Sequence, residues 1–302
     1  MMKKYLTSTI IVLGLFIAGD IGVFHILRSG LDRYYGLNKQ AKILCVGHSH
    51  TVLGLDAERM QKELGTPVSK YAMAGANTLD RLWMVRHFLA QHPSVNTVIY
   101  DVDPWLFDTE GLSSASYTLF LPYINDPGMS SYLFQQATWQ EYVVAKYIGT
   151  ARFRDQTLLA SMYGLLGMNE KKKESRIRIE DYQNDLTQKK SRGIRINPDS
   201  LKCFTETIDY LVEQGVTVVL LGIPTLDLLN NTALQDRDSV FALFTKISNN
   251  HKNVLYFNYN KDYESDHKLF YDLRHLNKYG NAVVTDRLIR DLRLMTTSNN
   301  QQ

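Results

Sequence analysis

Three residues of this chain could form a nucleophilic site. Ser49 follows the apolar run 42–46 and Gly47, while Asp272 and His275 lie three residues apart near the end of the chain. A serine hydroxyl becomes a good nucleophile when a histidine takes its proton, and a carboxylate fixes the tautomer of that histidine. Because one turn can present both Asp272 and His275, the sequence predicts a triad of Ser49, His275 and Asp272.

Acyl transfer at such a serine also needs hydrogen-bond donors for the oxyanion that forms. The backbone N–H groups of Ser49 and Gly75 are candidates, since Gly75 follows a second apolar run and glycine admits close approach of a substrate. The amide of Asn77 is a candidate side-chain donor. Alternatively, Asn77 could simply cap the helix that follows it.

His48 and His50 flank Ser49, and together with Asp103 they are expected to line the same cleft. A His-x-His pair can ligate a metal, but no cluster of acidic, cysteine or histidine residues in the sequence completes such a site. We therefore expect neither a metal nor a cofactor. We expect Asp101 and Asp103 to point to opposite faces of their strand and not to act as a pair.

The elements that position these residues alternate between strands and helices. Strands are predicted at 42–46, 68–73, 97–102, 216–221 and 254–257. Helices are predicted at 56–64, 79–91 (with Thr78 as its cap), 201–213, 238–248 and 279–292. This alternation predicts an α/β fold with a flavodoxin-like, doubly wound parallel sheet of five strands. Ligands bind such sheets at the carboxyl ends of the strands, which is where the candidate residues lie.

The alternation breaks between about residues 104 and 195. Aromatic, helix-like stretches at 132–147 and 156–166 precede a polar stretch at 169–197. We expect a mostly helical insertion after the third strand, with core and lid residues. The basic residues of the polar stretch include Lys171, Lys172, Lys173, Lys189, Lys190 and Arg192. They favour a solvated loop, with a phosphate- or headgroup-binding surface as the alternative.

The N-terminus is predicted to be a membrane anchor. Lys3 and Lys4 precede the mostly apolar stretch 5–27, and about 20 apolar residues suffice to span a bilayer as a helix. Asp20 and His25 weaken this span without excluding it. A cleaved signal peptide would need small residues at −3 and −1 of its cleavage site, and the region around residue 18 lacks that pattern. A buried soluble helix is the remaining alternative.

The predicted organisation is an anchor at 1–30 followed by an α/β domain at 40–295. A single pass with the domain outside the cytoplasmic membrane is expected, because long domains translocate largely regardless of the basic residues after the span. The formal net charge of the 302 residues is only +3, which argues against nucleic acid as a partner. Two cysteines, Cys45 and Cys203, exclude a disulfide scaffold.

The order of these motifs resembles that of the SGNH (GDSL-type) hydrolase superfamily. Gly47-His48-Ser49 matches its first block with His48 in place of an aspartate, Gly75 matches the glycine of the second block, and Asp272-x-x-His275 matches the last. The third block aligns poorly with 101–104, because Asp103 stands where the family has its oxyanion-binding asparagine. An ionised aspartate offers only acceptors, so Asp103 is not expected to bind the oxyanion.

The phrases GHSHTVLGLD, YAMAGAN, VIYDVDPWLF and DLRHLNKYGN are similar to those of membrane-anchored SGNH-like proteins. That subgroup resembles the O-acetylation proteins of alginate and other exopolysaccharides and the D-alanylation protein of teichoic acid synthesis. The resemblance covers residues 40–103 and 200–292. It implies an extracytoplasmic serine esterase or O-acyltransferase that acts on acyl esters, especially acetyl esters, of cell-surface polysaccharide, with a membrane-bound O-acyltransferase as a candidate partner. The alternative is a weakly active or inactive module that binds glycan or docks such an acyltransferase.

Overall fold

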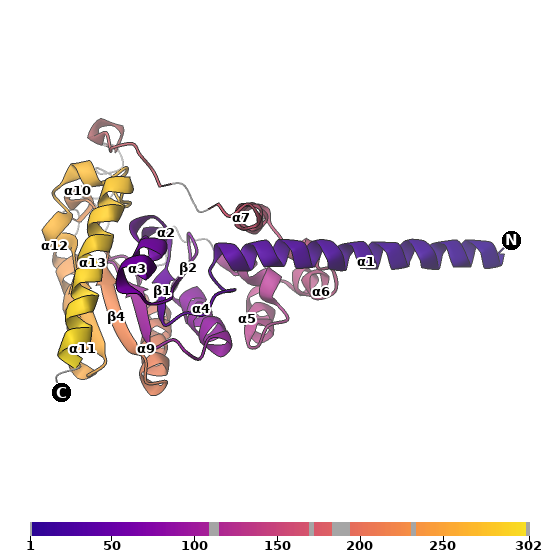
Figure 1. Cartoon of the computed structure of the whole chain (residues 1–302), viewed down its shortest axis with the longest axis horizontal. Coiled ribbons are helices and arrows are strands. Elements are labelled where there is room, and N and C mark those ends of the chain that lie inside the picture. Colours follow the sequence, from indigo (N-terminus) through magenta and orange to yellow (C-terminus); the bar gives the residue numbers. More distant parts are fainter. Residues whose placement is uncertain (1, 109–114, 169–171, 183–193, 231–233, 300–302) are drawn as a thin grey trace. The chain divides into compact units, whose positions relative to one another are not determined.

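The computed structural model describes residues 2–108, 115–168, 172–182, 194–230 and 234–299 (Figure 1). The chain divides into two compact units. One unit contains Met1–Asn38 and Ser114–Asn169, and we call it the helical unit. The other contains Lys39–Ser113 and Glu170–Gln302, and we call it the α/β unit.

The α/β unit is built on a parallel sheet of five strands, as the sequence predicts. The strands are β1 (Ile43–Gly47), β2 (Val68–Ala72), β3 (Thr97–Asp101), β4 (Thr217–Gly222) and β5 (Val254–Asn258). Their order in the sheet is β2-β1-β3-β4-β5, with Ile43 of β1 in register with Val68 on one side and Thr97 on the other. This order confirms the flavodoxin-like topology. No end of a predicted strand differs from the end in the structure by more than one residue.

Helices connect the strands on both sides of the sheet. They are α2 (Ser49–Gly54), α3 (Ala57–Leu64), α4 (Thr78–Gln91), α9 (Pro198–Glu213), α10 (Asp227–Asn230), α11 (Leu234–Asn250), α12 (Asn260–Tyr263) and α13 (Lys278–Asn299). Short 3₁₀ turns lie at η3 (Ile179–Tyr182) and η4 (His267–Leu269). The predicted cap of α4 is wrong by one residue. Asn77 is the N-cap, because its side chain accepts a hydrogen bond from the Asp80 N–H, and Thr78 is the first helical residue.

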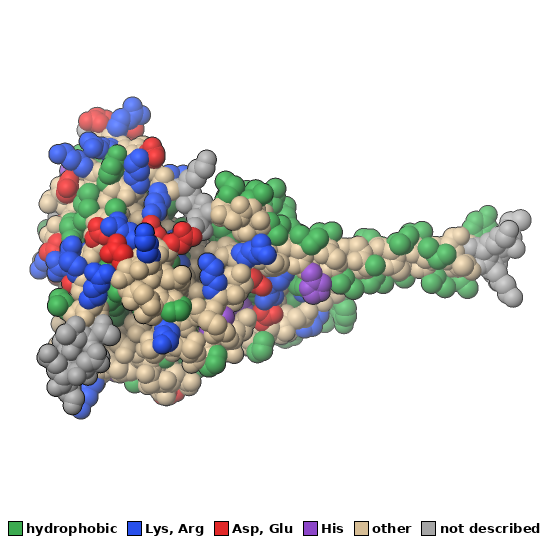
Figure 2. Space-filling view, in the orientation of Figure 1, with side chains coloured by type: hydrophobic (Ala, Val, Ile, Leu, Met, Phe, Trp, Pro, Cys, Tyr) green, Lys and Arg blue, Asp and Glu red, His purple; other side chains and the backbone are tan. Residues whose placement is uncertain are grey.

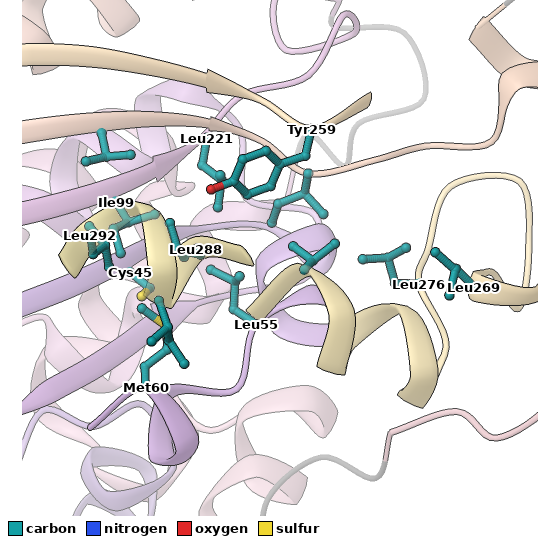
Figure 3. Packing of buried hydrophobic residues seen from close by; sticks show 14 of the residues in the cluster. Cys45, Leu55, Met60, Ile99, Leu221, Tyr259, Leu269, Leu276, Leu288 and Leu292 are labelled. Carbon is teal, nitrogen blue, oxygen red and sulfur yellow. The ribbon is translucent and has the colours of Figure 1, made fainter. Parts of the chain in front are cut away.

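Both faces of the sheet are buried, which explains why the inner strands are mostly apolar runs, whereas the edge strand β2 includes Ser69 and Lys70. On one face, a hydrophobic cluster joins β1, β3 and β4 to α13 and includes Cys45, Ile99, Leu221, Leu288 and Leu292 (Figure 3). On the other face, Tyr100 packs against Phe204 of α9, with 5.5 Å between ring centroids. The two layers hold the carboxyl ends of β1 and β3 rigidly beside each other.

The helical unit contains α1 (Met2–Tyr34), η1 (Ser116–Tyr123), α5 (Met129–Gln136), α6 (Trp139–Tyr147), η2 (Thr150–Arg152) and α7 (Asp155–Leu165). The predicted helical stretch at 132–147 spans two helices, because Thr138 starts α6 with a capping box. Within α1, residues Tyr5–Tyr34 form a segment long and apolar enough to cross a membrane, with a mean hydropathy of 2.3 in its most apolar window.

The anchor and the insertion, which the sequence suggests are separate, form one unit. Helix α1 continues to Tyr34, beyond the predicted end at residue 30. It packs on α7 so closely that a Cβ atom added to Gly164 would lie 1.8 Å from the carbonyl oxygen of Gly30. Only residues 114–169 of the predicted insertion at 104–195 belong to this unit, and its two ends belong to the α/β unit.

The described part of the polar stretch packs on the α/β unit. The Ile177 N–H donates to the Phe270 carbonyl, and Lys172 forms an ion pair with Asp56. These contacts favour a loop held against the domain. Lys171, Lys189, Lys190 and Arg192 lie outside the described residues, so a headgroup-binding surface there stays a prediction.

Candidate active site

The structure brings together the three residues of the predicted triad. Ser49 is the first residue of α2, directly beyond the end of β1, and His275 lies in the loop between η4 and α13. The Nε2 atom of His275 is 2.8 Å from the Ser49 hydroxyl, and its Nδ1 atom is 2.8 Å from Oδ2 of Asp272. Because an ionised carboxylate can only accept hydrogen bonds, Nδ1 of His275 carries the proton, and Nε2 accepts a hydrogen bond from the Ser49 hydroxyl.

The Asp272 carboxylate is fixed by its own turn. Its Oδ1 atom accepts hydrogen bonds from the N–H groups of Arg274 and His275, at 2.7 and 2.8 Å. Burial would raise the pKa of Asp272, but the hydrogen bonds from the His275 side chain and from these two N–H groups outweigh burial and lower the pKa. The side chain is therefore a carboxylate at neutral pH, as its role toward His275 requires.

A cavity of about 320 Å³ opens at the carboxyl ends of the strands, beside the triad. It lies within the α/β unit and is bounded by loops that follow β1, β2, β3 and β4 together with the loop before α13. Its lining includes all the predicted cleft residues: His48, Ser49, His50, Gly75, Asn77, Asp103 and His275. A substrate bound there would contact the nucleophile directly.

Two backbone donors face this cavity. In the part of the chain that the structure describes, the N–H groups of Ser49 and Gly75 donate to no other residue. Gly75 has a φ of +82°, whereas an added Cβ would meet nothing within 4 Å. The left-handed backbone therefore favours glycine at this position, and close approach of a substrate to Gly75 stays a prediction.

Asn77 has the capping role that the sequence analysis left as an alternative. Its Oδ1 atom accepts from the Asp80 N–H at 2.9 Å, and its own N–H donates to the Asp80 carboxylate at 2.9 Å. The cap uses the oxygen of the amide. A role for the Asn77 nitrogen toward an oxyanion stays a prediction.

His48 lies at the centre of a buried network behind Ser49. Its Nε2 atom is 3.1 Å from Asp103, its Nδ1 atom accepts from the His50 N–H at 3.1 Å, and Asp101 is 3.3 Å from the same Nδ1. The expectation that Asp101 and Asp103 point to opposite faces is wrong. Residues two apart in an extended chain share a face, so both carboxyl groups reach His48.

The pKa values of the two carboxyl groups in this network are shifted in opposite directions. Burial raises the pKa of Asp101, which favours its protonated form. Burial acts in the same direction on Asp103, but a hydrogen bond from His48 and the nearby charges of His48, His50 and Arg81 lower its pKa well below the ordinary value. Asp103 is thus an anionic acceptor. It also accepts from the Trp105 N–H at 2.7 Å, so its geometry is that of a structural acceptor and not of an oxyanion donor.

The expectation that no acidic, cysteine or histidine residue joins His48 and His50 in a cluster is also wrong. Ligand atoms of His48, His50 and Asp101 lie within 4.8 Å of one another. However, Nδ1 of His48 already accepts from the His50 N–H, and Nε2 of His48 is held by Asp103. Arg81 adds positive charge by donating to the Asp101 carbonyl at 2.8 Å. The donor set fits a hydrogen-bonded network better than a cation site.

Arg81 is a cavity-lining residue that the sequence analysis missed. Its side chain is only 1% exposed, and its guanidinium donates to the carbonyls of Ala76 and Asp101. It thereby ties the loop after β2 to the end of β3. The signal in the sequence is a charged residue on the buried side of α4, four residues after its cap.

Comparison with known proteins shows similarity at the level of the chain fold. No protein-family model and no curated protein matches this chain. The psychrotrophic esterase EstA from Pseudoalteromonas is 8% identical, with a TM-score of 0.44, and the match covers 85% of this chain and 99% of that one. A GDSL-like lipase from Bacteroides thetaiotaomicron is 10% identical, with a TM-score of 0.41, over 88% of this chain and 97% of that one. At these identities and TM-scores, the similarity concerns the chain fold alone.

Proposed function

We propose that the protein is a serine-dependent ester hydrolase or O-acyltransferase of the SGNH type. The observation that carries this proposal is the continuous chain of hydrogen bonds from Asp272 through His275 to Ser49, which ends in the cavity. A histidine with one nitrogen on a carboxylate and the other on a serine hydroxyl is arranged for general-base activation of that serine.

The reaction follows from this arrangement in two steps. The Ser49 oxygen attacks the acyl carbon of an ester while His275 takes the hydroxyl proton, and the oxyanion receives hydrogen bonds from the Ser49 and Gly75 N–H groups. The alcohol leaves with the proton from His275, which gives an acyl-Ser49. Water or a sugar hydroxyl then gives its proton to His275 and attacks the acyl carbon, which releases Ser49 and either an acid or a new ester.

We propose acyl esters of cell-surface polysaccharide, and acetyl esters in particular, as the substrates. The cavity of about 320 Å³ supports a small acyl group, because it lies at the lower end of the range for ligand pockets, roughly 300–1,000 Å³. The apolar helix α1 supports a membrane anchor, and we propose that the α/β unit lies outside the cytoplasmic membrane, because long domains translocate largely regardless of nearby basic residues. A membrane-bound O-acyltransferase is the partner that we propose for such an anchored domain.

A fluorophosphonate probe tests the nucleophile directly. We expect the probe to label the wild-type chain at Ser49 and the Ser239→Ala control, in which an exposed serine of α11 is removed, and to leave Ser49→Ala unlabelled. Mass spectrometry after reaction with an activated acetyl ester should then show an acetyl adduct on Ser49. Release of this adduct to water or to added polysaccharide distinguishes hydrolysis from transfer. Absence of any adduct would favour the glycan-binding or docking module instead.

A further inference from the structure

The apolar part of α1 that precedes its carboxylate is too short to cross a bilayer. Residues 5–19 number 15, and at about 1.5 Å per residue they extend roughly 22 Å. The hydrocarbon core of a membrane is about 30 Å thick and needs about 20 residues. A spanning α1 must therefore continue past Asp20 to about Phe24, so Asp20 lies at membrane depth.

At that depth one side of α1 contacts the rest of the helical unit. The Asp20 carboxylate accepts hydrogen bonds from the Gly149 N–H, the Thr150 N–H and the Thr150 hydroxyl, at 2.7, 2.8 and 2.6 Å. One turn further along, Phe24 packs against Phe153, with 6.1 Å between ring centroids. The segment that contains η2 thus shares the depth of Asp20 and supplies the donors that a carboxylate needs in hydrocarbon.

Helix α7 has the residue distribution of a helix that faces lipid. Its buried side consists of small or polar residues, namely Thr157, Ala160, Ser161 and Gly164, and the last of these touches Gly30 of α1. Its exposed side beyond the first turn is apolar and consists of Leu158, Leu159, Met162 and Leu165, with Leu166 following the helix. A water-facing helix has the reverse distribution, whereas small residues at the helix contact are typical of membranes.

The surface around α7 continues this apolar character. Trp139 is 66% exposed and Tyr147 is 81% exposed, and both residue types are enriched where a bilayer meets water. Arg28 of α1 forms ion pairs with Asp32 and with Asp126 of the same unit, at 2.8 and 2.7 Å. Figure 2 shows apolar side chains, interspersed with other residues, along the part of α1 that extends beyond the rest of its unit. The exposed face of α7 adds to the apolar surface that α1 already presents.

We infer that residues 139–168, the α6–α7 segment, are seated in one leaflet of the bilayer and contact lipid acyl chains alongside α1. This inference rests on the proposed anchor. It makes the membrane element of this protein a helical bundle of distant segments instead of a single helix.

Lipid-quenching of site-specific probes tests this inference in the full-length chain. Burial raises the pKa of the Cys45 thiol to about 12, so a Cys203→Ser background leaves no reactive native thiol at neutral pH. A single environment-sensitive fluorophore is then attached at Leu159→Cys, Leu166→Cys, Val12→Cys or Leu294→Cys. Leu294 of α13 is the matched control, because it is 66% exposed and Leu166 is 69% exposed. The labelled proteins are reconstituted into phosphatidylcholine vesicles with or without brominated acyl chains.

We expect the probes at positions 159 and 166 to lose emission to brominated lipid as the probe at position 12 does, while the probe at position 294 responds only to aqueous iodide. Quenching at position 12 combined with iodide access at 159 and 166 would overturn the seated segment and leave the anchor intact. Iodide access at position 12 as well would overturn the anchor. Shielding of 159 and 166 from both quenchers would indicate a protein partner and overturn the lipid contact.

Discussion

Substitutions of Asn77 can distinguish its role as a helix cap from its predicted role in stabilising the transition state. In the structure, its Oδ1 atom caps α4 through the Asp80 N–H, at 2.9 Å. Asn77→Ala removes this acceptor and should lower the free energy of unfolding by about 1 kcal/mol. Asn77→Ser and Asn77→Asp keep an acceptor of equal capping strength. Their free energies of unfolding should stay within a few tenths of a kcal/mol of the wild type.

The effect on turnover should follow a different order. A side-chain donor to an oxyanion contributes about 2.7–4 kcal/mol to the transition state, which corresponds to a factor of roughly 10²–10³ in kcat. All three variants lose the amide donor, so all three should lose more than about a hundredfold in kcat. Asn77→Asp should be at least as slow as Asn77→Ser, because a carboxylate repels the developing negative charge.

Both quantities can be measured on the full-length chain in detergent. Turnover of an activated acetyl ester gives kcat, and urea unfolding followed by circular dichroism gives the stability. Wild-type kcat in Asn77→Ser and Asn77→Asp, with a stability loss confined to Asn77→Ala, would exclude Asn77 as an oxyanion donor. Asn77 would then be only a cap, and the oxyanion would depend on the Ser49 and Gly75 N–H groups alone.

Three further predictions concern the triad, the buried network and the helix contact. Ser49→Ala and His275→Ala should each lower ester turnover by about 10⁴–10⁶, and the double variant should be little worse because the residues act as a unit; steady-state kinetics showing multiplicative losses would contradict this. Asp103→Asn removes the anionic partner of His48 and should lower the free energy of unfolding by about 1–3 kcal/mol at neutral pH. Because the pKa of Asp103 is lowered in the folded state, the ionised side chain stabilises the fold above the ordinary value of 3.8, and this stabilisation is lost as pH falls through the folded pKa. Urea unfolding should therefore show the stabilities of the wild type and of Asp103→Asn converging in acid. A stability difference that does not change with pH would contradict the role of Asp103 in the network. Gly164→Ala should lower thermal stability, since its Cβ would meet the Gly30 carbonyl, whereas Gly19→Ala, with nothing within 4 Å, should not; equal melting temperatures would argue against the close contact.

Much of the α/β unit could be predicted from local patterns. Most of the strands are apolar runs bounded by turn residues, because both faces of the sheet are covered, and several of the helices between them carry a start or stop signal. The Asp272-x-x-His275 motif also acts locally. The Asp272 carboxylate accepts hydrogen bonds from the N–H groups of Arg274 and His275, two and three residues later, so the spacing alone places it beside the imidazole. The apolar run at 42–46 likewise predicts that Ser49 follows a strand.

Contacts between distant segments depend on the tertiary arrangement, even where the sequence suggests which residues meet, as it does for the triad. The contact of His275 with Ser49 joins residues 226 positions apart, and it exists because the order of strands places both loops at one edge of the sheet. The convergence of Asp101 and Asp103 on His48 needs β1 and β3 to be neighbours, which only the sheet order decides.

The N-terminal helix shows the same division most clearly. Its apolar composition by itself predicts a membrane span, and within that reading Asp20 is an unexplained cost. The tertiary structure supplies the partner: the N–H groups of Gly149 and Thr150, which lie 129 and 130 residues away, satisfy the carboxylate. Hydrogen bonding and close packing act over a few ångströms in space regardless of separation along the chain. Local sequence patterns therefore specify most of the helices and strands, whereas the packing of these elements in three dimensions sets which of their side chains meet.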